Sequence, residues 1–296
     1  MSIVPAKCTE CGGMLQVDQE KDAAVCPHCN TPFIIEKAIN NYIGISGQND
    51  FEIRAGVLIK YNGAEDNVIV PNNVTIISSE AFAGLTGIRS AEIPDSVEVI
   101  EEFAFSSCTR LTNVRLPGSI TSIERALFLA CSALTDINIP DSVKSIEEGA
   151  FGQCSSLTSI TIPDGFTSIG KIAFGGCTGL TEITIPDSVR SIGEGAFAKC
   201  SALTKIILPD GIKFIGKAAF EQCSALLSIT IPDSITFIGE AVFRDCFNLT
   251  SIIIPDSVSH INKTAFSGCI NLTAINGKPI EKYRAHKIKT NKSIWE

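Results

Sequence analysis

Apolar and polar positions follow a pattern that repeats every 23 residues over most of the chain. In one unit, Ile160 and Ile162 alternate with polar residues, which is the period of a strand that buries one face. Pro163 then closes this strand, because proline cannot donate to a parallel ladder, and the aspartate after it suits a turn. Phe166 and Ile169 predict a second short strand, and the Ala-Phe segment that follows is expected to form a helical turn or a 3₁₀ piece.

Three residue types keep this period without an insertion or a deletion. Phenylalanine recurs at Phe82, Phe105, Phe128, Phe151, Phe174, Phe197, Phe220, Phe243 and Phe266. Proline recurs at Pro71, Pro94, Pro117, Pro140, Pro163, Pro186, Pro209, Pro232 and Pro255. Cysteine recurs at Cys108, Cys131, Cys154, Cys177, Cys200, Cys223, Cys246 and Cys269. This regularity predicts a solenoid whose units stack about 4.8 Å apart and extend over roughly 43 Å.

The unit L-x-x-I-x-I-P-x-x-V-x-x-I-x-x-x-A-F resembles the repeat of the BspA-type leucine-rich repeat family over about residues 64–276. It differs from the common leucine-rich consensus in placing Pro-Asp after the strand, where an asparagine would be expected. The resemblance implies a right-handed, gently curved solenoid with two sheets, which bacterial relatives often use to bind proteins or surfaces. Many of those relatives are exported.

Four further cysteines near the N-terminus lie outside this ladder, in the spacing C-x₂-C-x₁₄-C-x₂-C: Cys8, Cys11, Cys26 and Cys29. Two such knuckles can supply the four thiolates of a tetrahedral zinc site. We predict a zinc ribbon with a structural Zn²⁺ rather than a redox dithiol, because four thiolates close the coordination sphere. His28 is expected to be a bystander, and the segments MLQV and AAV are expected to pair as a hairpin.

The predicted fold class is therefore an α/β-type repeat solenoid, mostly β, with about nine units and a small zinc ribbon before it. Repeat arrays need capped ends, so a hairpin around the turn YNGAED is expected to seal the N-terminal end. The predicted domains are a zinc ribbon (1–36), a linker (37–50), an N-terminal capping hairpin (51–71), the solenoid (72–276) and a C-terminal cap or basic tail (277–296).

Charge and composition limit the classes of function that the chain can have. A net charge of −8 and a pI near 5.1 argue against a nucleic-acid binder that depends on phosphate contacts. The first residues do not read as a secretory signal, and no stretch is long and apolar enough for a membrane span, so a cytoplasmic location is expected. In that reducing compartment the ladder cysteines are expected to be buried, inert thiols beside the phenylalanines.

Toward the C-terminal end of the solenoid, large side chains replace small polar residues at several of the variable positions. The predicted partner-binding residues are Ile207, Phe214, Phe237, Phe247, Ile253 and His260, with Ile270 as a further apolar residue. Phe214, Phe237 and His260 occupy the same position of successive repeats, where most earlier repeats have serine. Clustered exposed apolar residues mark contact surfaces, although these could also pack against the C-terminal cap or fill partly buried corners.

No catalytic motif is present: the sequence has no Ser-His-Asp or Cys-His arrangement, phosphate loop or inserted loop, so an enzyme is not expected. We predict a scaffold that presents a solenoid face to a protein partner. The alternative is a nucleic-acid-associated factor that uses the zinc ribbon and the basic tail, whose net charge is +4 over residues 278–296. That tail could also support self-association through the C-terminal repeats, or be only a solvated face.

Overall fold

The computed structural model describes residues 3–8, 13–18, 23–34, 50–276 and 278–279. The chain divides into two compact units, Met1–Gly63 and Ala64–Glu296. Within the described residues the regular structure consists of 24 strands and includes no helix. A mostly β repeat solenoid, as predicted, is thereby confirmed for the second unit.

The first unit contains three antiparallel hairpins. They are formed by β1 (Ile3–Lys7) with β2 (Met14–Asp18), β3 (Ala23–Val25) with β4 (Pro32–Ile34), and β5 (Phe51–Arg54) with β6 (Val57–Tyr61). The predicted pairing of MLQV with AAV is wrong, because these segments lie in β2 and β3, which belong to different sheets. Each strand pairs instead across its own knuckle, where the N–H groups of Cys8 and Cys26 donate to carbonyls five residues later at 2.9 Å.

The third hairpin reverses at Ala55 and Gly56, not at the YNGAED segment. Both residues have positive φ, 49° and 81°, which is the conformation of a tight two-residue hairpin turn. The N–H group of Asn62 donates to the carbonyl of Asp50 at 2.6 Å and closes the open end of the hairpin. YNGAED instead leads out of β6 toward β7, whose register already follows the repeat.

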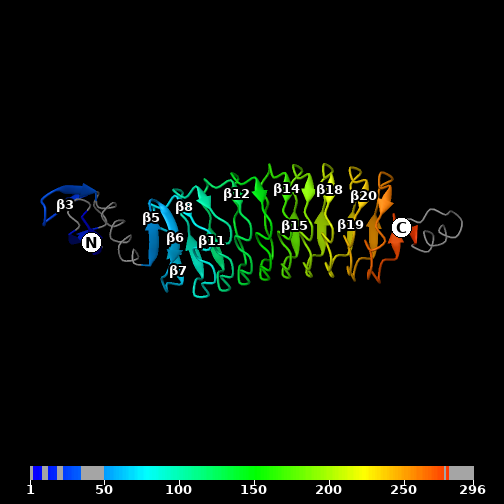
Figure 1. Cartoon of the computed structure of the whole chain (residues 1–296), viewed down its shortest axis with the longest axis horizontal. Helices are drawn as coiled ribbons and strands as arrows, with labels where there is room; N and C mark the ends of the chain where they lie inside the picture. Colours follow the sequence, from blue (N-terminus) through cyan, green and yellow to red (C-terminus); the bar gives the residue numbers. More distant parts are fainter. Residues whose placement is uncertain (1–2, 9–12, 19–22, 35–49, 277, 280–296) are drawn as a thin grey trace. The chain divides into compact units, whose positions relative to one another are not determined.

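The second unit is a stack of 23-residue coils whose strands form two parallel columns (Figure 1). The coils that contain residues 136–138 and 159–161 contribute a strand to column B only. Column A contains β7 (Asn67–Ile69), β9 (Ser90–Glu92), β11 (Asn113–Arg115), β15 (Glu182–Thr184), β17 (Lys205–Ile207), β19 (Ser228–Thr230), β21 (Ser251–Ile253) and β23 (Ala274–Ile275). Column B contains β8 (Ile76–Ile77), β10 (Val99–Ile100), β12 (Ser122–Ile123), β13 (Ser145–Ile146), β14 (Ser168–Ile169), β16 (Ser191–Ile192), β18 (Phe214–Ile215), β20 (Phe237–Ile238) and β22 (His260–Ile261). At the C-terminal end, β24 (Lys278–Pro279) runs antiparallel to β23.

Neighbouring strands pair residue to residue with the repeat length as their offset, as Asn113 does with Ser90. The prolines end column A, and seven of the nine proline carbonyls accept a hydrogen bond from the residue three positions on, as Pro140 does from Val143 at 3.0 Å. This is the turn that the Pro-Asp pair predicts.

The segment that carries Ala and Phe forms turns instead of the expected helical or 3₁₀ piece. In one coil the N–H groups of Gly149, Phe151 and Gln153 donate to carbonyls of the next coil at 2.7–2.8 Å. The N–H groups between them donate to carbonyls three residues earlier in the same coil. A helix would direct every N–H back along its own segment, so this alternation excludes one and adds a third hydrogen-bonded ladder between the coils.

The phenylalanines form a continuous stack through the core. Phe151 is fully buried, and its ring centroid lies 5.5 Å from those of Phe128 and Phe174 with nearly parallel planes. Aliphatic residues of columns A and B cover the stack on the other sides of the coil. The last ring of the column, Phe266, stacks on Phe243 with centroids 5.4 Å apart and is 9% exposed.

We expect Phe151→Ala to lower the free energy of unfolding by about 3–5 kcal/mol, because it removes a buried ring with two stacked neighbours. Cys154→Ala removes a much smaller group and should cost about 1 kcal/mol. The matched control is Phe266→Ala at the end of the stack, which should cost less than Phe151→Ala. Urea unfolding of the three variants, followed by circular dichroism, measures this order, and equal costs for Phe151→Ala and Phe266→Ala would contradict it.

Candidate functional site

The cysteines of the first unit form a compact thiol cluster. The sulfur atoms of Cys8, Cys26 and Cys29 all lie within 4.8 Å of one another, so this cluster could hold a metal ion. Cys8 and Cys26 are buried and belong to the small core of this unit, and Cys29 is half-buried against it. The hairpins position them: Cys8 follows β1, and the other two lie between β3 and β4.

The spacing of the sulfur atoms fits tetrahedral thiolate coordination. The Sγ atoms of Cys8 and Cys29 are 3.7 Å apart. In a tetrahedron with metal–sulfur bonds of about 2.3 Å, the sulfur atoms are about 3.8 Å apart. The N–H group of His28 also donates to the Sγ of Cys26 at 3.3 Å.

His28, which is predicted to be a bystander, is not among the grouped ligand atoms of the described residues. Its side chain is exposed, and its Nε2 lies 3.1 Å from the carbonyl oxygen of Met14. Cys11, the fourth predicted ligand, lies outside the described residues. Its place in the sequence, three residues after Cys8, matches that of Cys29 after Cys26.

The ladder cysteines have a different environment. Each of the eight thiols donates to the carbonyl of the phenylalanine in the preceding coil, as Cys154 does to Phe128 at 3.1 Å. The carbonyl oxygen of Phe128 also accepts a hydrogen bond from the N–H group of Cys131 in the same coil as Phe128. The thiol of Cys154 therefore bonds to the second lone pair of this oxygen. The sequence predicted packing for these cysteines but gave no sign of this hydrogen bond.

Burial also makes the seven ladder thiols from Cys108 to Cys246 poor nucleophiles. It raises the pKa of Cys177 and of Cys223 to about 12, well above the ordinary thiol range. Desolvation likewise raises the pKa of Cys154 and Cys200 in the middle of the ladder. Cys269 at the C-terminal end is half-buried, unlike the seven thiols before it. The column is therefore part of the core.

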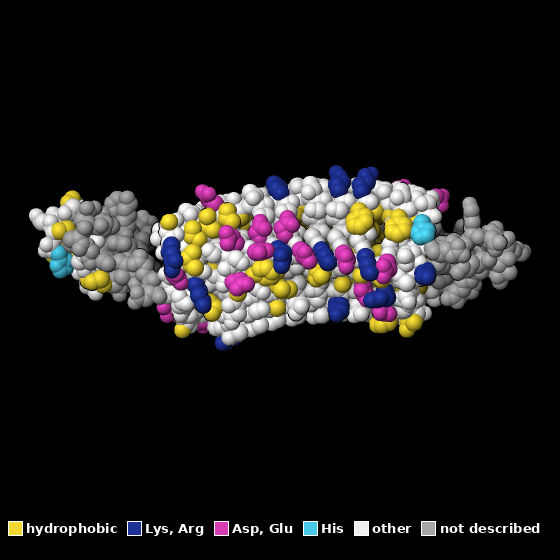
Figure 2. Space-filling model, viewed as in Figure 1, with side chains coloured by type: hydrophobic (Ala, Val, Ile, Leu, Met, Phe, Trp, Pro, Cys, Tyr) yellow, Lys and Arg dark blue, Asp and Glu magenta, His cyan; other side chains and the backbone are white. Residues whose placement is uncertain are grey.

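The predicted partner-binding residues lie on different parts of the coil. Phe214, Phe237 and His260 are the first residues of β18, β20 and β22 in column B, and all three are exposed. The rings of Phe237 and His260 are stacked, with centroids 5.4 Å apart. In Figure 2 a group of hydrophobic side chains and a histidine stand out near the C-terminal end of the second unit. Ser191 fills the same position one coil before Phe214.

Ile207 and Ile253 lie in column A instead, as the outward last residues of β17 and β21. Phe247 lies in the turn after the ladder cysteine, together with Ile270, which is 77% exposed. The structure therefore separates the six predicted residues into the column B group, the column A pair and a turn residue. Leu227 was not predicted; it is exposed at a position where the neighbouring coils carry threonine.

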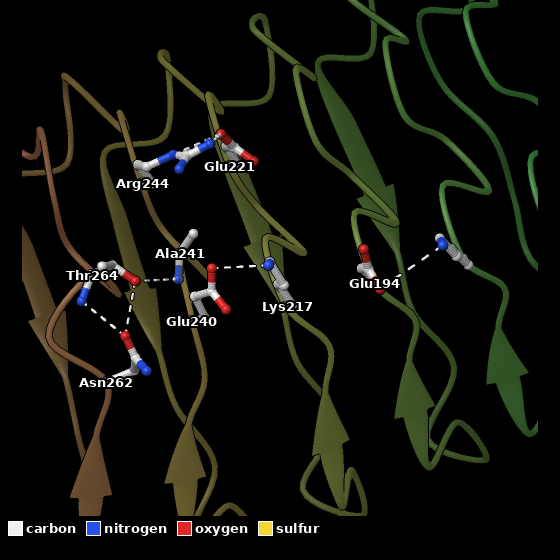
Figure 3. Close-up of polar contacts among 9 residues, drawn as sticks. Glu194, Lys217, Glu221, Glu240, Ala241, Arg244, Asn262 and Thr264 are labelled. Atoms are coloured by element: carbon white, nitrogen blue, oxygen red, sulfur yellow. Dashed lines mark hydrogen bonds and ion pairs between the residues drawn. The ribbon is translucent and has the colours of Figure 1, made fainter.

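A column of charged residues alternates in sign along the coils, at the start of the turn that carries the phenylalanine. We call it the charge column; its members are Glu102, Arg125, Glu148, Lys171, Glu194, Lys217, Glu240 and Lys263. All eight are exposed. Opposite charges meet between neighbouring coils, with 2.9 Å between the Lys217 Nζ and the Glu240 carboxylate and 3.9 Å between the Lys171 Nζ and the Glu194 carboxylate (Figure 3). This column was not predicted, although the alternation at the repeat spacing was the signal that could have found it.

The predicted basic tail and most of the predicted linker lie outside the described residues. No helix in the described part of the chain is long and apolar enough to cross a bilayer. A model of the BspA type Leucine rich repeat region matches residues 60–181 and 144–273, which together cover most of the chain. No curated protein matches the chain in sequence.

Several solved structures are similar to this chain. A leucine rich cell surface protein from Faecalibacterium prausnitzii is 26% identical, with 76% of this chain and 86% of that chain covered and a TM-score of 0.40. A leucine-rich repeat protein from T. pallidum is 23% identical, with 83% and 97% covered and a TM-score of 0.43. One from Bacteroides ovatus is 23% identical, with 95% of each chain covered and a TM-score of 0.43.

The raised thiol pKa values predict loss of stability at alkaline pH. An unfolded thiol ionises near pH 9, whereas Cys177 and Cys223 keep their protons in the folded state up to about pH 12. Their contribution is complete below about pH 9 and is lost as the pH rises toward 12, by about 1.4 kcal/mol per pH unit for each thiol. Urea unfolding between about pH 8 and 11 measures the slope.

The control for this slope is the double variant Cys177→Ala with Cys223→Ala. Its stability should fall less steeply over the same range, by about 2.7 kcal/mol per pH unit for the two missing thiols. An unchanged slope would show that other groups cause the alkaline loss.

Proposed function

This chain belongs to the BspA-type leucine-rich repeat family, and we propose that it is a non-enzymatic scaffold that binds a protein partner through column B of its C-terminal coils. One observation carries the proposal. Phe214 and Phe237 are 56% and 46% exposed, and His260 continues their column, in a position where the four preceding coils have serine. Exposed aromatic side chains in a contiguous group are typical of protein contact surfaces.

The column B group supports this role better than the column A pair does. Phe237 and His260 stack on each other, whereas Ile207 and Ile253 are separated by the coil of Thr230. A partner can therefore cover the aromatic group as one continuous surface. The backbone beneath it is held by the in-register pairing of β20 with β22, so little order has to be gained on binding.

We assign the thiol cluster of the first unit a structural zinc ion, held by Cys8, Cys26 and Cys29 together with Cys11. The 3.7 Å separation of the Cys8 and Cys29 sulfur atoms supports this assignment. The core of this unit is small, and a bound zinc would supply the folding free energy that the core lacks. A cytoplasmic location, where thiols stay reduced, is part of the same proposal.

We expect Phe214→Ser with Phe237→Ser to abolish capture of the partner by the tagged full-length chain. The matched control is Ile207→Thr with Ile253→Thr in column A, which should capture the partner as the unchanged chain does. Each variant introduces a residue that other coils carry at the same position, so both should keep the circular dichroism spectrum of the parent. Mass spectrometry of the captured proteins is the measurement. Loss with the column A variant alone would overturn the proposal.

For the metal, the purified chain is expected to contain one zinc ion, measured by atomic emission. Cys26→Ser should remove it, because it takes away a buried ligand, whereas Cys154→Ser in the ladder should leave it in place. A strong chelator should change the tryptic cleavage of residues 1–63 and leave residues 64–276 protected. Equal zinc content in the two variants would exclude the site.

A further inference from the structure

The signs of the charge column are arranged so that the column complements a reversed copy of itself. It begins with Glu102, ends with Lys263 and alternates at every coil between them. If a second copy runs antiparallel, with the twofold axis between the coils of Lys171 and Glu194, every acid faces a base. The facing pairs are Glu102 with Lys263, Arg125 with Glu240, Glu148 with Lys217, and Lys171 with Glu194.

Two of the facing pairs in column B are complementary in side-chain size about the same axis. Phe214 would face Ser145 of the second copy, and Phe237 would face Ser122. The two serines are half-buried and the two phenylalanines are exposed. Each ring would therefore meet a small side chain that leaves room for it on the surface of the other copy. Figure 2 shows the row of alternating charges and the aromatic group on one face of the second unit.

A third column, between these two, follows the same rule. Its position is occupied by glutamate in the first three coils, by glycine in the next four and by Asn262 in the last. About the same axis, Glu147 would face Gly216, and Glu124 would face Gly239. The complementarity ends at the position just before column B in the sequence, where Lys144 would face Lys213. These two exposed side chains mark the rim of the face.

From these three columns we propose that the partner on this face is a second copy of this chain, bound antiparallel about that axis. This inference rests on the proposed function, and it identifies the protein partner of the scaffold as the chain itself. The face spans eight coils, about 38 Å along the stack and about 13 Å across it. That is roughly 500 Å² per copy, at the lower end of specific interfaces, so the dimer is weak and depends on concentration.

The charge column also makes the dimer sensitive to salt. The facing charges are exposed at the surface of each copy, so their attraction is screened at high ionic strength. Sedimentation equilibrium of the full-length chain should show a monomer–dimer equilibrium at about 50 mM salt that shifts to monomer at about 500 mM. A monomer at every concentration and at low salt would overturn the inference.

An exchange of two charges separates contacts between copies from contacts within one copy. Lys217→Glu with Glu240→Lys keeps the composition and the ion pair between these two coils. It places like charges opposite Glu148 and Arg125 of the second copy, and it also places like charges next to Glu194 and Lys263 within the chain. We expect the dimer to be lost. Adding Arg125→Glu and Glu148→Lys restores opposite charges across the axis and should restore the dimer, although it adds like-charge neighbours within the chain.

The four-substitution variant therefore distinguishes the two explanations. If the alternation serves the single chain alone, this variant has no dimer to regain, and it should be the least stable of the three proteins. Lys205→Glu on column A is the control and should leave the dimer unchanged. A chain that remains monomeric while Phe214→Ser with Phe237→Ser abolishes capture of another protein would refute this inference and leave the proposed function standing.

Discussion

Every side chain of the solenoid lies next to the equivalent side chain of the coils before and after it, because the strands pair in register at the repeat length. A residue type can recur in consecutive coils only if its side chains fit next to each other at about 4.8 Å. Phenylalanine satisfies this with parallel rings, and cysteine satisfies it by donating to the carbonyl of the preceding coil. In the charge column the signs alternate, so each charge lies next to an opposite charge in the neighbouring coil.

The same constraint explains how much could be predicted from the sequence. Residues that stack on themselves leave a period, so the coils, the strand pair of each unit and the buried Phe151 followed directly from it. The turn at Gly149–Gln153 could not be predicted, because its hydrogen bonds join neighbouring coils and no local propensity records them. Helical turns are the usual expectation for an Ala-Phe segment, and bonding between the coils overrides it.

The candidate sites were predictable to different degrees. Cysteine spacing alone identified the cluster of Cys8, Cys26 and Cys29, because two short knuckles leave few other arrangements. The strand pairing around it was wrong, since three-residue segments such as β3 carry too little pattern to choose a partner. The exposed residues were recognised from their size. Their division between columns A and B could be seen only in the structure of the coil.

The alternation of charge has a consequence for how the chain reaches its folded state. All coils share one backbone conformation, so a coil could in principle stack on the next but one and leave the intervening coil looped out. Such a skipped coil would place Lys171 beside Lys217, or Glu194 beside Glu240, and repulsion would oppose the error. The apolar columns cannot make this distinction, because phenylalanine stacks equally well on any phenylalanine. The exposed charges thus favour the stacking of each coil on its direct neighbour in the sequence during folding.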